Sequence, residues 1–144
     1  MNPNELKAYL FQNIPITKSL DLNILEASLE KVRLSAPFKT HKNHKNTAFG
    51  GSLNTLLTLS CWVLLHLNLP GHQIVITENK TDYLAPVTSD FEAVSTLPPK
   101  ETWEKFLNTL KRHKKGRLQL KATIHQGGTL AVAFTGTFAA FPHE

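Results

Sequence analysis

The sequence predicts an α+β fold in which an antiparallel sheet curves around one long, buried helix. Apolar residues recur at spacings of three and four between residues 53 and 67, which is typical of a helix. Segments on both sides of it alternate apolar and polar residues, as half-buried strands do. Gly127 and Gly128 separate two such segments, which predicts a hairpin and therefore antiparallel pairing. One apolar helix needs apolar cover on most of its sides, and a curved sheet supplies that cover.

Length and composition indicate a single globular domain over residues 1–144. Of the 144 residues, 41% are hydrophobic and 19% are charged, as in ordinary folded proteins. The net charge of +5 suggests an acidic ligand, although a charge of this size is also normal for a soluble protein. The single cysteine excludes an internal disulfide and fits a reducing cytosol. The longest unbroken apolar run in the central segment, Cys61–Leu65, is too short to span a bilayer. We therefore expect a cytoplasmic protein with no membrane partner.

Residues 2–13 predict a short N-terminal helix. Asn2 can cap it, Pro3 suits the first helical position, and Glu5 completes the start. Ile14-Pro15 ends it, because the residue before a proline avoids the helical conformation.

The segment from residue 21 to residue 37 is less clear. Residues 31–35 alternate as a half-buried strand does, whereas residues 24–29 fit either a helix or a strand.

The central helix is predicted to start at Gly50–Gly51 and to end before Leu69-Pro70-Gly71. Its apolar residues occupy nearly the whole circumference, so we expect it to be buried. The glycine pair allows a ligand to approach the backbone closely. A helix start also presents free N–H groups and a partial positive charge, which favours an anion or oxyanion at this point.

Two strands and one surface helix are predicted to follow the central helix. The strands are expected over residues 73–84 and 91–97. Pro98-Pro99 opens the helix and Gly116 ends it. The helix has one apolar stripe, made of Trp103, Phe106, Leu107 and Leu110.

The C-terminal hairpin is predicted from two alternating segments, residues 117–125 and 130–138, on either side of the glycine pair. Apolar side chains line one face of its last strand. The other face carries small residues, which would let another backbone or subunit approach closely: Ala131, Ala133, Thr135, Thr137 and Ala139.

Several kinds of chemistry are absent from the sequence patterns. The seven histidines form no metal-ligand spacing with carboxylates or cysteines, so no metal is expected. The sequence contains neither a phosphate-binding nor a dinucleotide-binding glycine motif. Ser52 follows the glycine pair without the second glycine of a nucleophile elbow, and Cys61 lies in the buried helix, where it should be inert.

Two stretches carry a resemblance to a known family: residues 44–53, HKNTAFGGSL, and residues 83–87, YLAPV. Together with the buried helix and the antiparallel strands, they resemble hotdog-fold thioesterases, most closely those related to the C-terminal domain of YiiD-type proteins. The resemblance extends from about Pro15 to Phe141. It implies hydrolysis of acyl groups linked to coenzyme A or acyl carrier protein, by a homodimer or dimer of dimers with sites at subunit interfaces. It implies no cofactor beyond the coenzyme A of the substrate.

We assign the oxyanion donor to the backbone N–H of Gly51. In the related PaaI-type enzymes, a carboxylate two turns beyond the second glycine acts as base or nucleophile, and here that position is Thr58. Gly51, Thr55 and Thr58 share one helical stripe, so Thr58 is expected to face the same pocket. A threonine positions water but cannot take its proton near neutral pH. The alternative is a Thr58 hydroxyl bonded to its own helix backbone.

A catalytic carboxylate would have to come from elsewhere, since no Asp or Glu occurs between Glu30 and Glu78. Another strand or another subunit would supply it, and the candidates are Glu78, Asp82 and Asp90.

Asn43 and His44 complete the predicted catalytic set with Gly51 and Thr58. Asn43 stands where PaaI-type enzymes have an asparagine that holds the carbonyl or the water. An imidazole is suited to proton transfer near neutral pH, which makes His44 a candidate, with a solvent-exposed loop histidine as the alternative. Phe49 replaces a histidine that often precedes the glycines in those enzymes. The residues expected to bind substrate are Phe49, Gly50, Ser52, Thr55, Lys42 and Lys45.

Two basic clusters could bind the phosphates of coenzyme A. Lys39, Lys42 and Lys45 precede the central helix. Residues 111–117 end the surface helix, where cations also complement the helix dipole. This second cluster lacks interleaved aromatic residues, which argues against nucleic acid as a partner. Because the central helix lacks a carboxylate, a non-catalytic protein that binds acyl thioesters stays open as the alternative function.

Overall fold

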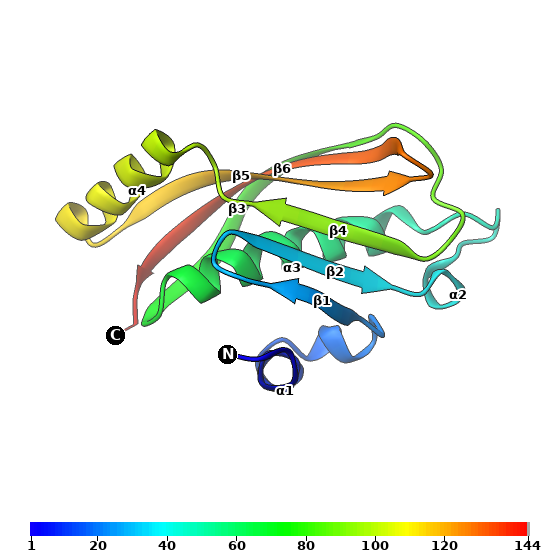
Figure 1. Cartoon of the computed structure of the whole chain (residues 1–144), viewed down its shortest axis with the longest axis horizontal. Coiled ribbons are helices and arrows are strands. Elements are labelled where there is room, and N and C mark those ends of the chain that lie inside the picture. Colours follow the sequence, from blue (N-terminus) through cyan, green and yellow to red (C-terminus); the bar gives the residue numbers. More distant parts are fainter. Residues whose placement is uncertain (144) are drawn as a thin grey trace.

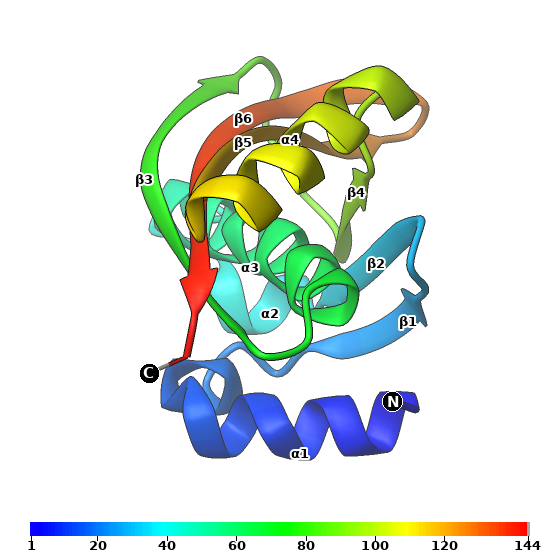
Figure 2. The same cartoon turned by 90° about the vertical axis from the view of Figure 1, so that its left-hand side faces the viewer.

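The computed structural model describes residues 1–143 and has one long helix, α3, partly enclosed by a six-stranded antiparallel sheet (Figures 1 and 2). The strand order in the sheet is β1-β2-β4-β5-β6-β3. The elements in chain order are α1 (Pro3–Asn13), the short 3-10 helix η1 (Pro15–Lys18), β1 (Asn23–Ala27), β2 (Lys31–Ala36), α2 (Phe38–His41), α3 (Gly50–Asn68), β3 (His72–Tyr83), β4 (Phe91–Thr96), α4 (Lys100–His113), β5 (Gly116–Gln126) and β6 (Thr129–Pro142). The predicted α+β architecture, with an N-terminal helix and one surface helix, is confirmed.

The sheet follows the predicted alternation. β5 and β6 pair from Gly116 opposite Ala140 to Gln126 opposite Thr129. The two glycines between them have φ values of 55° and 82°, the positive values that a tight hairpin turn requires. The segment left ambiguous by the sequence is strand β1, which pairs antiparallel with β2.

The predicted burial of α3 is confirmed for most of its circumference but not for one face. Nine residues of α3 are buried, among them Leu56, Leu57 and Leu64. Along the opposite face, however, Gly51 is exposed and Trp62 is only half-buried. The sheet ends at β1 and β3, so it cannot close around the helix. By length and composition alone α3 could cross a membrane, but half of its apolar window is buried here, as befits a core helix.

The start of α1 and the end of α4 each have a local cause. The Asn2 side chain accepts a hydrogen bond from the Glu5 N–H at 2.8 Å, which confirms the predicted cap of α1. The predicted end of α4 at Gly116 is wrong: Lys114 takes the left-handed conformation there, with φ 61°. Gly116 is the first residue of β5, and the Phe106 ring lies 3.0 Å from the place that a Cβ would occupy there.

We expect Leu57→Ala to lower the free energy of unfolding by about 2–5 kcal/mol, because Leu57 is fully buried in the core and its truncation leaves a cavity. Urea unfolding followed by circular dichroism measures the change. Leu29→Ala is the matched control: Leu29 is 53% exposed, so its truncation should change stability by less than about 0.5 kcal/mol. Equal effects of the two substitutions would contradict the assignment of α3 as the core helix.

Candidate active site

The glycine pair forms the first turn of α3. Phe49 is the cap residue, and its carbonyl accepts the N–H of Ser52 at 2.9 Å and the N–H of Leu53 at 3.2 Å. Within residues 1–143, no hydrogen bond joins the N–H of Gly50 or of Gly51 to another residue. Two backbone donors therefore remain available at the helix start, where the helix dipole adds a partial positive charge.

Two exposed aromatic rings flank these glycines. The Phe49 ring lies 2.6 Å from the place that a Cβ of Gly51 would occupy, and Phe49 is 59% exposed. The Tyr83 ring lies 3.5 Å from the corresponding place at Gly50, and its hydroxyl donates to the Gly50 carbonyl at 3.3 Å. A side chain at position 51 would collide with the Phe49 ring, so the present position of Phe49 requires glycine there.

A hollow of about 350 Å³ opens beside Gly50. Its walls are Thr47, Ala48, Gly50 and Leu53 on one side and residues 83–87 on the other. The Ala48 N–H donates to the Val87 carbonyl at 2.8 Å, so the two stretches that carry the family resemblance lie side by side. The structure brings Phe49, Gly50 and this hollow together at one end of α3.

The loop before the glycines is held in shape by Asn43. Its side-chain oxygen accepts from the Lys45 N–H at 2.9 Å and from the Thr47 N–H at 3.3 Å, and its amide donates to the Thr47 hydroxyl at 3.0 Å. Asn46 takes a left-handed conformation with φ 61°. The Asn43 side chain therefore forms its hydrogen bonds within the loop. Lys42, His44 and Lys45 are exposed on it.

His41 anchors the start of the same loop and was not singled out by its sequence pattern. It is buried, its Nε2 lies 2.7 Å from the Leu20 carbonyl, and its ring meets Phe91 edge-on. The Phe49 N–H donates to the His41 carbonyl at 2.8 Å, which fixes the backbone directly before the glycines.

Thr58 belongs to a chain of uncharged hydrogen-bonding groups that joins α3 to β3. Its hydroxyl donates to the Asn54 side-chain oxygen at 3.3 Å rather than to the helix backbone. The Asn54 amide donates to Thr81 Oγ1 at 2.8 Å and to Asn79 Oδ1 at 3.2 Å. The Thr81 hydroxyl also donates to Asn79 Oδ1, at 2.9 Å. Thr55, by contrast, donates to the Gly51 carbonyl at 2.8 Å. The i, i+4 spacing of Asn54 and Thr58 was the available sequence signal for the first link.

The candidate carboxylates do not reach this face of α3 within one chain. Asn79 and Thr81 contact Asn54, so the alternation of β3 places Glu78 and Asp82 on the opposite face of the sheet. The Asp90 carboxylate accepts the Phe38 N–H of α2 at 2.8 Å.

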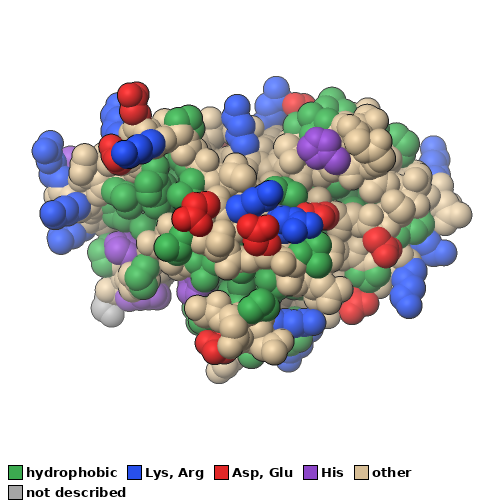
Figure 3. All heavy atoms as spheres, in the orientation of Figure 1, with side chains coloured by type: hydrophobic (Ala, Val, Ile, Leu, Met, Phe, Trp, Pro, Cys, Tyr) green, Lys and Arg blue, Asp and Glu red, His purple; other side chains and the backbone are tan. Residues whose placement is uncertain are grey.

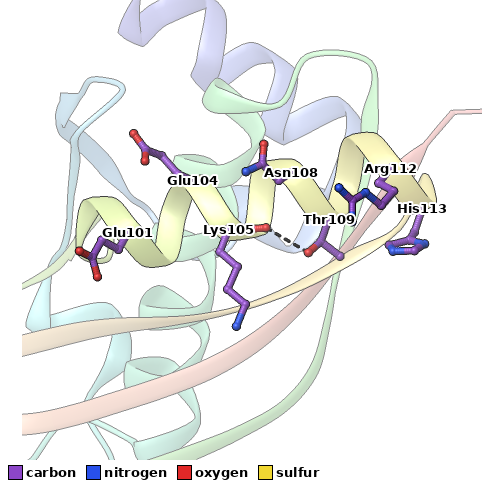
Figure 4. A pocket seen from close by; sticks show the side chains of 7 residues that line it. All are labelled: Glu101, Glu104, Lys105, Asn108, Thr109, Arg112 and His113. Carbon is purple, nitrogen blue, oxygen red and sulfur yellow. Dashed lines mark hydrogen bonds between the residues drawn. The ribbon is translucent and has the colours of Figure 1, made fainter.

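The two basic clusters lie at opposite ends of the molecule. Lys39 of α2 and the loop with Lys42 and Lys45 precede the start of α3, whereas residues 111–117 lie at the far end of α4 (Figure 1). Lys and Arg side chains gather at both ends of the long axis in Figure 3. A shallow hollow of about 490 Å³ follows the outer face of α4, and Figure 4 shows the side chains that line it: Glu101, Glu104, Lys105, Asn108, Thr109, Arg112 and His113. All seven come from one helix, so they enclose no ligand site.

Comparison with known proteins shows the family to which the chain belongs. Residues 3–142 match the family model described as "Putative thioesterase (yiiD_Cterm)". The crystal structure of a protein of unknown function from Chlorobaculum tepidum is 28% identical, with a TM-score of 0.86 over 98% of this chain and 94% of that chain. A "putative thioesterase" from Shewanella oneidensis is also 28% identical, with a TM-score of 0.82 over 97% of each chain.

A third neighbour shares the fold at lower identity. It is a Pseudomonas aeruginosa protein described as a "probable thioesterase", 18% identical, with a TM-score of 0.84 over 99% of this chain and 97% of that chain. The thioesterase neighbours have the hotdog fold, and the hotdog fold predicted for this chain is confirmed.

We expect the Cys61 thiol to be unreactive in the folded protein. Burial raises the pKa of Cys61 to about 12, against a smaller opposing effect of a hydrogen bond with Ser60, so the thiolate is scarce at pH 8. Ellman's reagent should label the protein only after unfolding in denaturant. Rapid labelling of the native protein would contradict the burial of this face of α3.

Proposed function

Since the chain belongs to the thioesterase family named for the YiiD C-terminal domain, we propose that it hydrolyses acyl thioesters of coenzyme A or acyl carrier protein. The observation that carries the proposal is the pair of free amide donors at the start of α3, beside a hollow of about 350 Å³. The proposal extends to its setting, a cytoplasmic enzyme that needs no metal and no cofactor besides the coenzyme A of its substrate.

Catalysis would centre on the thioester carbonyl. The N–H of Gly51 would donate to the carbonyl oxygen as negative charge develops there, with the Gly50 N–H beside it. Loss of one such donor costs roughly 3–4 kcal/mol of transition-state stabilisation. Water would attack the carbonyl carbon, the C–S bond would break, and the sulfur would leave as a thiol once protonated. The products are a carboxylic acid and the free thiol.

The attacking water would be held by Thr58, whose hydroxyl is oriented by Asn54. Thr58 cannot accept the water's proton near neutral pH. His44, an exposed histidine of the loop before the glycines, would accept that proton, and a carboxylate of a second subunit is the other source. Asn43 would act by holding the loop that carries His44.

Substrate binding would use the residues around the glycines. Lys42 and Lys45 are exposed and would meet the phosphates of coenzyme A or of a carrier's prosthetic group. Phe49 would cover the thioester, while Ser52 and Thr55 lie in the first turns beside it.

The proposed assembly is a homodimer or dimer of dimers. β3 is a long edge strand with one unpaired side, and such edges are normally protected in a folded protein. Apolar residues on or next to it are exposed: Val75, Tyr83 and Leu84.

A second candidate is a protein that binds acyl thioesters without cleaving them. The absence of any carboxylate from α3 favours it. Measurement of thiol release over a panel of acyl-CoA chain lengths separates the two, and buried Cys61 should add no background to the reagent. Binding of acyl-CoA with no thiol release at any chain length would refute hydrolysis and support the binding role.

Thr58→Ala is expected to lower kcat about 10²-fold, because a water displaced by about 1 Å loses a factor of that order. The loss of stability should stay near 1 kcal/mol, since one half-exposed hydrogen bond is removed. Thr58→Ser keeps the hydroxyl and should restore most of the turnover. A wild-type rate in Thr58→Ala would remove this residue from the mechanism.

A further inference from the structure

A second cleft, of about 230 Å³, lies against α3 on the side that the sheet leaves uncovered. It is formed between the η1 segment and the helix. The residues that line it are Ile14, Ile16, Thr17, Leu20, Asn54, Thr55, Thr58, Leu59 and Trp62.

The cleft continues the stripe that begins at Gly51. Gly51, Thr55, Thr58 and Trp62 follow one another at intervals of four, three and four residues, so they share one face of α3. Its polar residues on α3 occupy the turns nearest the free amide donors. Trp62 lies furthest from them along α3, and η1 and its flanks add Ile14, Ile16 and Leu20 to the lining. The polarity thus falls along the helix away from the proposed carbonyl site.

We propose that this cleft holds the acyl chain of the substrate, that it selects medium-length chains of about eight carbons, and that Trp62 sets the upper limit. This inference rests on the proposed thioester chemistry at Gly51 and specifies the acyl class that the same site accepts.

Length and volume agree on that limit. From Thr55 to Trp62 the helix rises by about 10 Å, at 1.5 Å for each residue. An extended chain advances by about 1.2 Å for each bond, so about nine carbons span that distance. A volume of 230 Å³ equals about eight groups of the size of a water molecule, at about 30 Å³ each, and a methylene is of similar size.

The Trp62 side chain is held in place by contacts with β3, with His66 on its own helix and, through His66, with α1. Its indole N–H donates to the Ile74 carbonyl of β3 at 3.0 Å. Its ring stacks on His66, with centroids 4.8 Å apart and planes 11° from parallel. Tyr9 of α1 stacks on His66 at 4.7 Å. Burial lowers the pKa of His66, and nearby His143 lowers it further, so the ring stacks in its neutral form near pH 7.

The chain-length profile of kcat/KM, measured from acetyl-CoA to palmitoyl-CoA, tests the proposal. Wild type should peak near octanoyl-CoA. Trp62→Ala should move the peak to longer chains and raise the palmitoyl-to-octanoyl ratio about tenfold, within the range that small changes in an apolar pocket produce. Ile16 is an exposed residue of the cleft lining, and Ile16→Trp should move the peak to shorter chains. This variant still tests the proposal if Trp62→Ala does not fold. Trp103→Ala removes an indole from α4, outside the cleft, and should leave the peak in place.

A binding measurement separates this inference from the proposed hydrolysis. In Trp103→Phe, Trp62 is the only tryptophan, and octanoate should change its fluorescence in a saturable way while acetate and free coenzyme A should not. Saturable octanoate binding in a protein that hydrolyses no thioester would support the cleft and refute the enzyme. Hydrolysis with a profile that neither Trp62→Ala nor Ile16→Trp changes would overturn the cleft alone. If either variant changes the molar mass measured by light scattering but not the chain-length profile, a second copy of the chain fills the cleft. That result would also overturn the proposed acyl site.

Discussion

A sheet with two free edges covers a helix on only part of its circumference, and the structure of this protein depends on that constraint. The leucine-rich side of α3 packs into the concave face of the sheet, where its residues are buried. The side facing the gap between β1 and β3 cannot be covered in the same way. It carries glycine, asparagine and threonine near its start and tryptophan and histidine near its end. The same geometry that builds the core therefore leaves one polar stripe on which a site can form.

The β-bulge in β3 extends this polar stripe onto the sheet. Between Ile76 and Glu78 the register with β6 shifts by one residue, which changes the face to which later side chains point. Ile74 is buried, whereas Asn79 and Thr81 point toward α3 and bond to Asn54. An edge strand thus contributes apolar cover in its first half and hydrogen-bonding groups in its second.

The sequence predicted the parts of the fold that local patterns determine. The alternation of residues 117–125 and the glycine pair after it gave the hairpin, and Asn2 gave the start of α1. The short β1 strand stayed ambiguous because five residues hold too little periodicity to separate a strand from a helix. The end of α4 was misplaced because Gly116 serves packing against Phe106 rather than a turn.

The candidate site was predictable only where one short stretch builds it. The free amides at Gly50 and Gly51 follow from a glycine pair at a helix start. The hydrogen-bonded links from Thr58 to Asn79 join residues far apart in the sequence, and no local pattern contains them. The alternation of β3 likewise turns Glu78 and Asp82 away from α3. Within this chain the stripe carries no carboxylate, so the proposed hydrolysis would take its proton acceptor from the His44 loop or from a second subunit. The proposed chemistry at this helix would then depend either on the loop that Asn43 holds or on assembly through the edge strand β3.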